Sequence, residues 1–226
     1  GSWQYTWTKD AAPVWFQVGK SASIPKTWKD VYFSVNPGRA QMSGKQRGGI
    51  DNVESINVLF SEFDAKDGWT IDQIHKLTPA PSVIIASGGG WHCYWLLASP
   101  VTVTPESVSE IRKLQARWVN FTGGDEGAKD IARVLRLPGT LNHKYTPARP
   151  VEFLKCDLAQ VYDLGTLKSF LPAESPARPT PIEPMQEPAS ASQDAIIQYW
   201  LNYYTQRAYP GQRDAMAHRL GLQLHN

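Results

Sequence analysis

The stretch LFSEFDAKDG at residues 59–68 carries acidic side chains inside what is otherwise the sequence of a buried strand. Apolar residues predict a strand over 56–63, and an unpaired charge in such a strand is strongly unfavourable or forces the group to protonate. Side chains two apart on a strand point to one face, so Glu62 and Asp64 are expected to project together, away from Phe63. Two carboxylates so placed indicate either a bound hard cation such as Mg²⁺ or Mn²⁺, which prefers oxygen ligands, or a solvent-facing edge strand.

The sequence on either side of this strand predicts a sheet domain in which strands and helices alternate. Thr70 and Gln73 have the spacing of a helix capping box, and glycines 88–90 join two apolar runs in the manner of a hairpin. Thr104, followed by a proline and an acid, has the features of a helix start. The predicted elements are, in chain order, strand 56–63, helix 70–77, strands 83–86 and 91–97, helix 104–122 and strand 131–137. This order indicates an α/β or α+β domain.

Proline content predicts how the chain is divided. Six of the 17 prolines lie in residues 172–193, a stretch with almost no large apolar side chain. Such a segment does not pack into a core and is expected to form an extended linker. We therefore expect one domain over residues 1–171. After the linker, apolar residues recur at helical spacing, so residues 194–226 are expected to begin a helical domain.

Composition argues against a membrane protein and a disulfide-rich scaffold. The chain has 226 residues, 42% of them hydrophobic, and a formal net charge of +2. It has no apolar run of the roughly 18–20 residues that span a bilayer and no signal-peptide pattern, so a cytoplasmic protein without membrane contact is expected. Cys93 and Cys156 are too few for a disulfide framework, and neither belongs to a C-x-x-C pair.

Basic residues are clustered in two stretches of an otherwise balanced chain. Residues 34–49 hold Arg39, Lys45 and Arg47 without an acid, and residues 129–149 hold five basic residues against one acid. Local clusters of this kind indicate a bound polyanion, although a solvated basic face has the same composition.

The stretch SGGGWHCYWLL at residues 87–97 has the features of an anion-binding turn that leads into a strand. Ser87 and Gly89 belong to a turn whose three glycines allow backbone N–H groups to approach an anion closely. His92 follows on the same strand face as Tyr94 and can donate to a phosphate oxygen. A single histidine on a strand is equally well explained as a structural residue, so both interpretations stay open here.

The stretch KDIARVLRLPGTLNHK at residues 129–144 places an acid and several cations near one another. Asp130 is expected to begin a strand and has the same parity as Arg136, so a carboxylate and a guanidinium should face one way. Arginine matches a phosphate with its planar fork, and lysine acts as a point charge. The further residues that can line the same cleft are Arg133, whose parity differs, and Asn142, His143 and Lys144 beyond the Pro-Gly turn.

Taken in order, these three stretches resemble the archaeo-eukaryotic primase superfamily. The residues that carry the resemblance are E-F-D at 62–64, S-G-G-G-x-H-x-Y-W at 87–95 and D-x-x-R-V-L-R-L-P-G-T-x-N-x-K at 130–144. The similarity covers roughly residues 30–165 and is greatest to primase-polymerases of phages, plasmids and other mobile or CRISPR-associated elements. It implies an α+β fold with an RRM-like catalytic sheet beside an N-terminal α/β module. The tail, GQRDAMAHRLGLQL, is more weakly similar to the opening of the helical domain that follows such catalytic cores.

The resemblance also implies a site for nucleotide addition. Glu62, Asp64 and Asp130 match the acids that hold two Mg²⁺ or Mn²⁺ ions, with Glu62 standing where Asp is common. His92, with Ser87 in the preceding turn, matches the histidine motif that holds the phosphates of the incoming nucleotide. No zinc is expected, because the chain lacks the cysteines of the zinc-binding insertion that many relatives carry. The residues then assigned to nucleotide binding are Ser87, Gly89, His92, Arg133, Arg136, Asn142 and Lys144, and those assigned to nucleic acid are Arg39, Lys45 and Arg47.

We therefore expect a nucleotidyltransferase, a DNA primase or DNA polymerase. It should act as a monomer on single-stranded or primer–template DNA, with NTP or dNTP substrates. A replication-initiator nuclease with an RRM-like fold should show a His-x-His site, and the five histidines form none. A non-catalytic RRM-type binding module would carry aromatic residues on its central strands, where this chain has Glu62 and Asp64.

Overall fold

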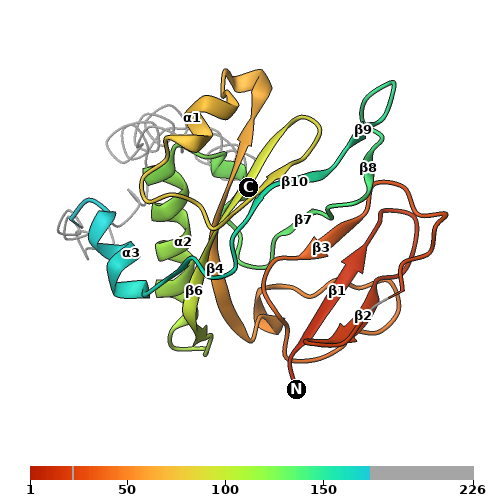
Figure 1. Ribbon diagram of the computed structural model, residues 1–226. Coiled ribbons are helices and arrows are strands. Elements are labelled where there is room, and N and C mark those ends of the chain that lie inside the picture. Colours follow the sequence, from red (N-terminus) through yellow and green to blue (C-terminus); the bar gives the residue numbers. More distant parts are fainter. Residues whose placement is uncertain (22, 174–226) are drawn as a thin grey trace, which may run out of the picture. The chain divides into compact units, whose positions relative to one another are not determined.

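Two mainly antiparallel sheets and a small hairpin form the framework of residues 1–21 and 23–173, the part of the chain that the computed structural model describes (Figure 1). The N-terminal sheet has the strand order β2 (Val14–Gln17), β1 (Trp3–Trp7), β3 (Tyr32–Ser34), β7 (Val134–Arg136). The second sheet, named the central sheet below, contains β10 (Glu152–Cys156), β5 (Val83–Ala86), β6 (Gly90–Thr102), β4 (Ser55–Asp64) and β11 (Val161–Tyr162). The hairpin consists of β8 (Leu141–Asn142) and β9 (Arg149–Pro150).

Strand β6 organises the central sheet. It pairs antiparallel with β5 on one side and with β4 on the other, and β11 runs parallel to it at Leu96 and Leu97. The predicted β5–β6 hairpin across the three glycines is confirmed, with Ala86 opposite Trp91. The predicted strand at 91–97 is longer than expected, because β4 continues to pair with β6 as far as Thr102.

All described α-helices follow β4 in the chain. They are α1 (Ile71–His75), α2 (Val108–Thr122) and α3 (Leu164–Phe170), and the short 3₁₀ segments are η1 (Ile50–Asn52), η2 (Ala65–Asp67) and η3 (Glu126–Ala128). The capping box predicted at Thr70 and Gln73 is present at the start of α1. The N-terminal module is therefore built of strands, and in the described residues it contributes no α-helix.

The long helix begins at Val108, four residues after the predicted start, and Thr104 caps the turn that leads into it, as predicted. Thr104 and Ser107 form a closed turn in which each backbone N–H donates to the other's hydroxyl oxygen, at 2.9 and 3.2 Å. This turn satisfies the backbone before the helix begins at Val108. The predicted end is confirmed, because Gly123 caps the helix in the left-handed conformation, with φ of 74°.

The central sheet separates two apolar layers. Its face with Leu59, Phe63 and Trp95 packs against α2, where Trp95 meets Trp118 edge to face at 5.0 Å between ring centroids. Its other face carries a second cluster that includes Phe60 and Tyr94 and that packs against the N-terminal sheet. The two sheets leave an apolar groove of about 260 Å³ between them, lined by residues that include Phe33, Tyr94, Leu137 and Phe153. The second face therefore carries both sheet-to-sheet packing and open surface.

The outer edge of β4 is held by side chains and a turn. The side-chain amide of Gln115 on α2 donates to the Phe60 carbonyl at 2.8 Å and accepts from the Phe60 N–H at 3.4 Å. The N–H of Asp125 donates to the Glu62 carbonyl at 2.8 Å. On this edge β4 pairs with no other strand of the described chain, so these bonds satisfy its free backbone groups. They fix the position of β4 where its two carboxylates project.

The predicted linker and helical domain, residues 172–193 and 194–226, lie outside the described residues except for 172 and 173. Leu171 is buried in the core cluster under α2, and the Arg117 guanidinium donates to the Pro172 carbonyl at 2.7 Å. The domain end at residue 171 stays a prediction. None of the helices in the described part of the chain combines the length and the apolar character that crossing a bilayer requires.

Candidate active site

Glu62 and Asp64 project from the same face of β4, as the sequence predicted. Phe63 between them is buried in the layer under α2, whereas both carboxylates are partly exposed on the other face. In the pairing with β6, Glu62 lies opposite His92 and Asp64 lies opposite Gly90. The acid pair and the histidine therefore meet on neighbouring strands, at the end of the sheet where the glycine turn lies.

A guanidinium neutralises Glu62. Arg133 donates through Nε to Oε1 at 2.8 Å, and its Nη2 lies 2.7 Å from the same oxygen. Burial raises the pKa of Glu62, Arg133 opposes that rise, and the charges of Asp125 and Asp64 add to it. The sequence places Arg133 below Arg136 as a phosphate ligand, because its strand parity differs. That ranking for phosphate binding stays a prediction, and the structure adds that Arg133, directly before β7, is the arginine in contact with the acid pair.

Asp64 is the more exposed acid of the pair. Its Oδ2 lies 2.9 Å from the Lys66 Nζ, and this hydrogen bond raises the pKa of Lys66. Both side chains are well exposed, so the contact contributes little to stability. The second carboxylate is therefore free to exchange a lysine for another cation.

His92 is buried and neutral. Only 5% of its surface is exposed, and its Nε2 lies 3.8 Å from Glu62 Oε2, which is longer than a hydrogen bond. Burial, together with the positive charges of Arg136 and Arg133, lowers the pKa of His92 to about 3. Nδ1 has no hydrogen-bond partner among the described residues. The ring is a neutral donor held against the acid pair rather than a cation.

The structure does not bring Asp130 to the acid pair. The strand predicted over 131–137 is shortened to β7, and Asp130 lies in an exposed turn where its Oδ1 accepts from the Ala132 N–H at 3.0 Å. This local turn replaces the expected strand geometry, so the parity argument that linked Asp130 to Arg136 fails. The charge of Asp130 acts instead on Tyr5 of the N-terminal sheet, whose pKa is raised mainly by burial.

Asp125 is the acid that the sequence interpretation missed. Its backbone bonds to Glu62, and its charge raises the pKa values of both Glu62 and Lys66. A Cβ on Gly124 would lie 2.9 Å from the Ser61 Cβ, so only glycine lets the chain approach β4 this closely. The sequence signal that could have found Asp125 is its position directly after the double glycine that ends α2.

The hairpin β8–β9 covers the glycine turn that was predicted to hold an anion. The Asn142 amide donates to the Ser87 carbonyl at 2.7 Å, and the Arg149 guanidinium donates to the Gly88 carbonyl at 2.9 Å. The Ser87 N–H donates to the Gly90 carbonyl, and the Tyr145 ring stacks under Arg149 at 3.9 Å. Asn142 is buried and positions the turn. A contact of Gly89 with nucleotide stays a prediction.

Of the remaining predicted phosphate ligands, Arg136 is paired with a carboxylate and Lys144 is exposed. Arg136 Nη1 lies 2.6 Å from Asp30 Oδ1, which also accepts from the His143 N–H at 3.0 Å. Lys144 has an exposed side chain, while its N–H donates to Asn142 Oδ1 at 3.0 Å. Arg136 therefore already has a carboxylate partner, and Lys144 is the more available cation.

The three basic residues predicted to contact nucleic acid also differ. The Arg39 guanidinium donates to the Val103 carbonyl, and the Arg47 guanidinium lies over the Trp7 ring at 4.4 Å from its centroid. Lys45 is exposed. Arg39, although exposed, thus ties its loop to Val103 just after β6, and Lys45 and Arg47 are the exposed cations of this set without such a bond in the described residues.

The acid pair has the donor chemistry of a hard divalent ion. Glu62 and Asp64 supply carboxylate oxygens on one face, and their mutual repulsion is currently balanced by Arg133 and Lys66. In residues 1–21 and 23–173, no three acidic, histidine or cysteine side chains are close enough to hold an ion together. Two carboxylates suit Mg²⁺, which keeps waters or substrate phosphates as its other ligands. The pair therefore fits such an ion as part of its coordination shell.

Comparisons with known proteins agree with this architecture. No family model matches the chain. A curated replication protein from Clostridium perfringens is 26% identical over 138 residues, which cover 56% of this chain and 33% of that protein. The chain thus spans about a third of the length of that relative.

A solved primase-polymerase domain shares the fold of the chain. The AEP domain of the primase-polymerase of cyanophage S-2L superposes with a TM-score of 0.52 and 21% identity, over 76% of this chain and 88% of that domain. The primase RepB′ superposes with a TM-score of 0.40 and 14% identity, over 62% of this chain and 43% of that one. The expected fold is confirmed: the described chain has the archaeo-eukaryotic primase fold.

Proposed function

We propose that this chain is the nucleotidyltransferase domain of a primase or primase-polymerase, which adds NTPs or dNTPs to a 3′-hydroxyl on a DNA template. The observation that carries the proposal is that Glu62 and Asp64 share one face of β4, with His92 opposite Glu62 on β6. The fold shared with a phage primase-polymerase domain and the similarity to a bacterial replication protein support it.

Glu62 and Asp64 would hold Mg²⁺ or Mn²⁺, with the charge of Asp125 beside them. When bound, such ions lower the pKa of an attacking hydroxyl and neutralise the leaving phosphates. The involvement of Asp130 would require its turn to move, so we assign it no contact. The two carboxylates would orient the ion at the end of β4, where the bonds to Gln115 and Asp125 fix the strand.

Arg133 and Lys66 would change partners when substrate binds. Both cations now neutralise the acid pair. Once a bound metal ion neutralises the two carboxylates instead, both side chains would be released. Released guanidinium and ammonium groups suit phosphate oxygens, because arginine offers a planar fork and lysine a point charge. His92 would donate from its neutral ring to a phosphate oxygen. Positioning and charge neutralisation of this kind supply most of the acceleration in phosphoryl transfer.

An extension assay tests the proposal. A labelled primer annealed to a longer template is incubated with the chain and Mg²⁺ or Mn²⁺, with either NTPs or dNTPs. The proposal predicts template-dependent lengthening of the primer that needs a divalent ion and stops in EDTA. No lengthening under any of the four combinations, with a folded protein, would reject it.

A further inference from the structure

Four side chains form a row along the N-terminal sheet, with two aromatic rings in the middle and a cation at each end. The Arg47 guanidinium lies 4.4 Å from the Trp7 ring centroid, and the Trp7 and Tyr32 rings are 5.5 Å apart. Arg136 lies 4.9 Å from the Tyr32 ring centroid. Neither ring serves the apolar clusters of the core.

The register of three strands produces this row. Trp7 on β1 pairs with Tyr32 on β3, and Tyr32 pairs with Arg136 on β7. Residues directly opposite one another in antiparallel strands share a face, so these three side chains must lie side by side. Arg47 is added from the loop between β3 and β4, at the outer end of the row.

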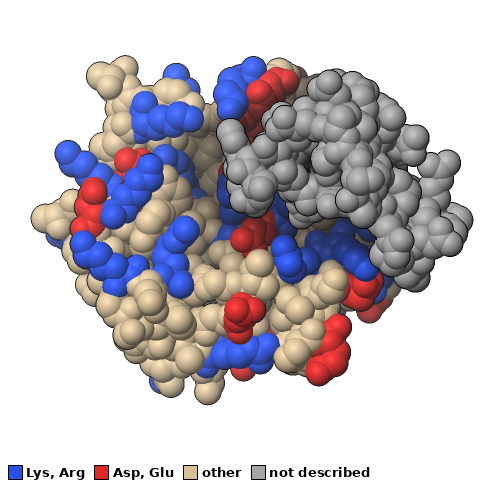
Figure 2. Space-filling model, turned by 180° about the vertical axis from the view of Figure 1, so that it is seen from behind, with Lys and Arg blue, Asp and Glu red and all other residues tan. Residues whose placement is uncertain are grey.

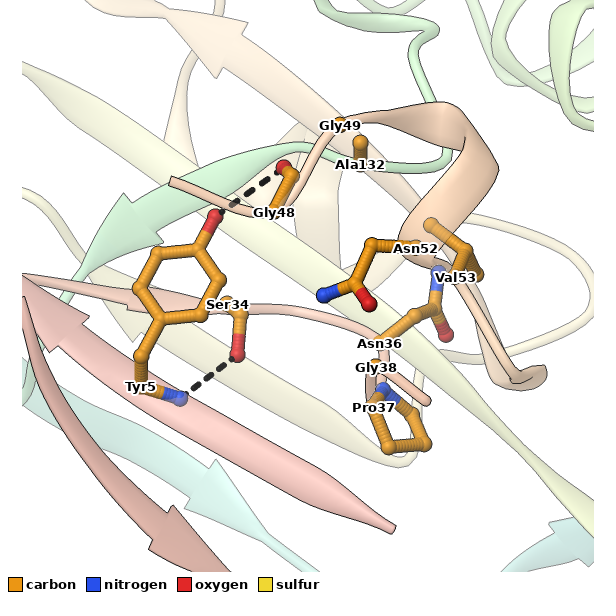
Figure 3. A pocket seen from close by; sticks show the side chains of 10 residues that line it. All are labelled: Tyr5, Ser34, Asn36, Pro37, Gly38, Gly48, Gly49, Asn52, Val53 and Ala132. Atoms are coloured by element: carbon orange, nitrogen blue, oxygen red, sulfur yellow. Dashed lines mark hydrogen bonds between the residues drawn. The ribbon is translucent and has the colours of Figure 1, made fainter. Parts of the chain in front are cut away.

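The loop that carries Arg47 is fixed by its own contacts (Figure 3). The Tyr5 hydroxyl donates to the Gly48 carbonyl at 3.5 Å, next to Arg47 in the chain. Asn52 bonds through its side chain to both backbone groups of Ala40, at 3.0 and 3.2 Å. The cavity between these residues has a volume of only about 10 Å³, room for a single water. These contacts fix the backbone next to Arg47, and the cavity is not itself a ligand site.

The charges along the row are unequal. Arg136 is only 12% exposed and is paired with Asp30. Arg47 is exposed and has no carboxylate partner among the described residues. Residues 1–52 hold seven basic and three acidic residues. On the part of the surface in Figure 2 where the N-terminal sheet lies, Lys and Arg side chains are more common than Asp and Glu. Arg47 is therefore a preorganised, unneutralised cation in a segment rich in basic residues.

The row is connected to the acid pair through β7. Arg136 ends β7, and Arg133, directly before β7, contacts Glu62. The charge of Arg136 also contributes to lowering the pKa of His92, so the inner end of the row lies within electrostatic reach of the site. The row and the acid pair are therefore joined through β7.

We infer that this row, defined as Arg47, Trp7, Tyr32 and Arg136, binds the single-stranded template next to the site, an assignment that rests on the proposed function. Single-stranded nucleic acid is bound by cations that contact phosphates and by flat groups on which bases stack, and a guanidinium held on an aromatic ring serves both purposes. Arg47 makes the phosphate contact and offers its flat face for stacking, and the Trp7 ring holds it in place. Arg136, with Asp30, anchors the inner end.

The test measures binding of a fluorescein-labelled single-stranded oligonucleotide to the full chain over a range of salt concentrations. Arg47→Ala should weaken binding about tenfold or more and reduce the slope of log affinity against log salt by about 0.7, the value for one phosphate contact on a single strand. Trp7→Leu should weaken binding about fivefold or more with the slope unchanged, because the charge remains. Arg47→Lys should keep the slope and lose affinity.

Two controls keep the test decisive. Lys168→Ala removes an exposed charge on α3 and should change neither affinity nor slope beyond a few per cent of the Arg47→Ala effect. Melting temperatures show whether Trp7→Leu is folded, and Arg47 is exposed, so its replacement leaves the fold intact. Wild-type affinity and slope in Arg47→Ala would overturn the inference while primer extension by the wild-type chain still supported the proposed function. A wild-type chain that neither bound the oligonucleotide nor extended a primer would reject both.

Discussion

Arg133 and Glu62 are 71 residues apart in the chain and are joined by contacts of 2.8 and 2.7 Å to a single carboxylate oxygen. This pair explains how a carboxylate can lie in the middle of a largely buried strand. It also means that the site is electrically balanced before any ion binds.

Removing the Arg133 guanidinium should destabilise the protein, because it leaves the Glu62 carboxylate without its counter-charge. In EDTA, Arg133→Met should lower the free energy of unfolding by about 1–3 kcal/mol, because Glu62 loses its partner while it remains largely buried. Arg133→Lys should recover part of the loss. Urea denaturation measures both. Mn²⁺ should stabilise Arg133→Met more than the wild type, because the ion no longer competes with the arginine. Unchanged or increased stability of Arg133→Met in EDTA would contradict this account of the pair.

Asp30 should make the free energy of unfolding depend on pH in the acid range. Although burial raises its pKa, hydrogen bonds from the Arg136 side chain and the His143 backbone lower it below the ordinary value of 3.8. The folded protein then binds fewer protons than the unfolded chain, so this stabilisation is present above pH 3.8 and is lost as the pH falls through the lower folded pKa. Asp30→Asn should cost about 0.5–1 kcal/mol at neutral pH and reduce the acid-side loss. Urea unfolding across the acid range measures this, and identical curves would refute it.

His92 should affect nucleotide binding more than template binding. His92→Leu keeps the volume but removes the donor, and should weaken nucleotide affinity about tenfold or more. His92→Gln can still donate and should retain part of that affinity. The affinity for template should change in neither variant. Equal nucleotide affinity in His92→Leu and wild type, together with a lowered melting temperature, would assign the histidine a structural role only.

Gly90 should not tolerate a side chain. A Cβ at this position would collide with the Phe63 carbonyl and lie 2.9 Å from the Asp64 Cα, and neither backbone atom can move without shifting the acid pair. Gly90→Ala should therefore destabilise the protein by at least about 1–3 kcal/mol. Gly49→Ala is the matched control, with no atom within 4 Å of its Cβ, and should change stability by less than about 0.5 kcal/mol. Equal melting temperatures for the two variants would show that the β4–β6 pairing is looser than described.

Local patterns predicted the elements that position the acid pair. The apolar run around Glu62, the glycine hairpin and the capping box at Thr70 each have short-range signals, and all three are present. The Asp130 turn was missed because a side-chain bond to nearby backbone competed with the predicted strand.

Contacts between distant residues could not be predicted from spacing. Nothing local indicates that Arg133 reaches Glu62 or that Arg136 reaches Asp30, because both pairs depend on how β7 lies beside other strands. The same is true of the aromatic row, which exists only because β1, β3 and β7 are neighbours. Sequence order predicted the strands that carry Glu62, Asp64 and His92, and the packing decides which cation each one meets.

The central claim is that Glu62 and Asp64 together support nucleotide addition. The most direct measurement is primer extension by the double variant Glu62→Gln, Asp64→Asn, with Mg²⁺ and with Mn²⁺, beside oligonucleotide binding and a melting curve. The amides keep the shape of both side chains and the acceptor for Arg133. We predict a folded protein that binds the oligonucleotide as the wild type does and extends the primer at least about a hundredfold more slowly with either ion. Extension at the wild-type rate would contradict the account.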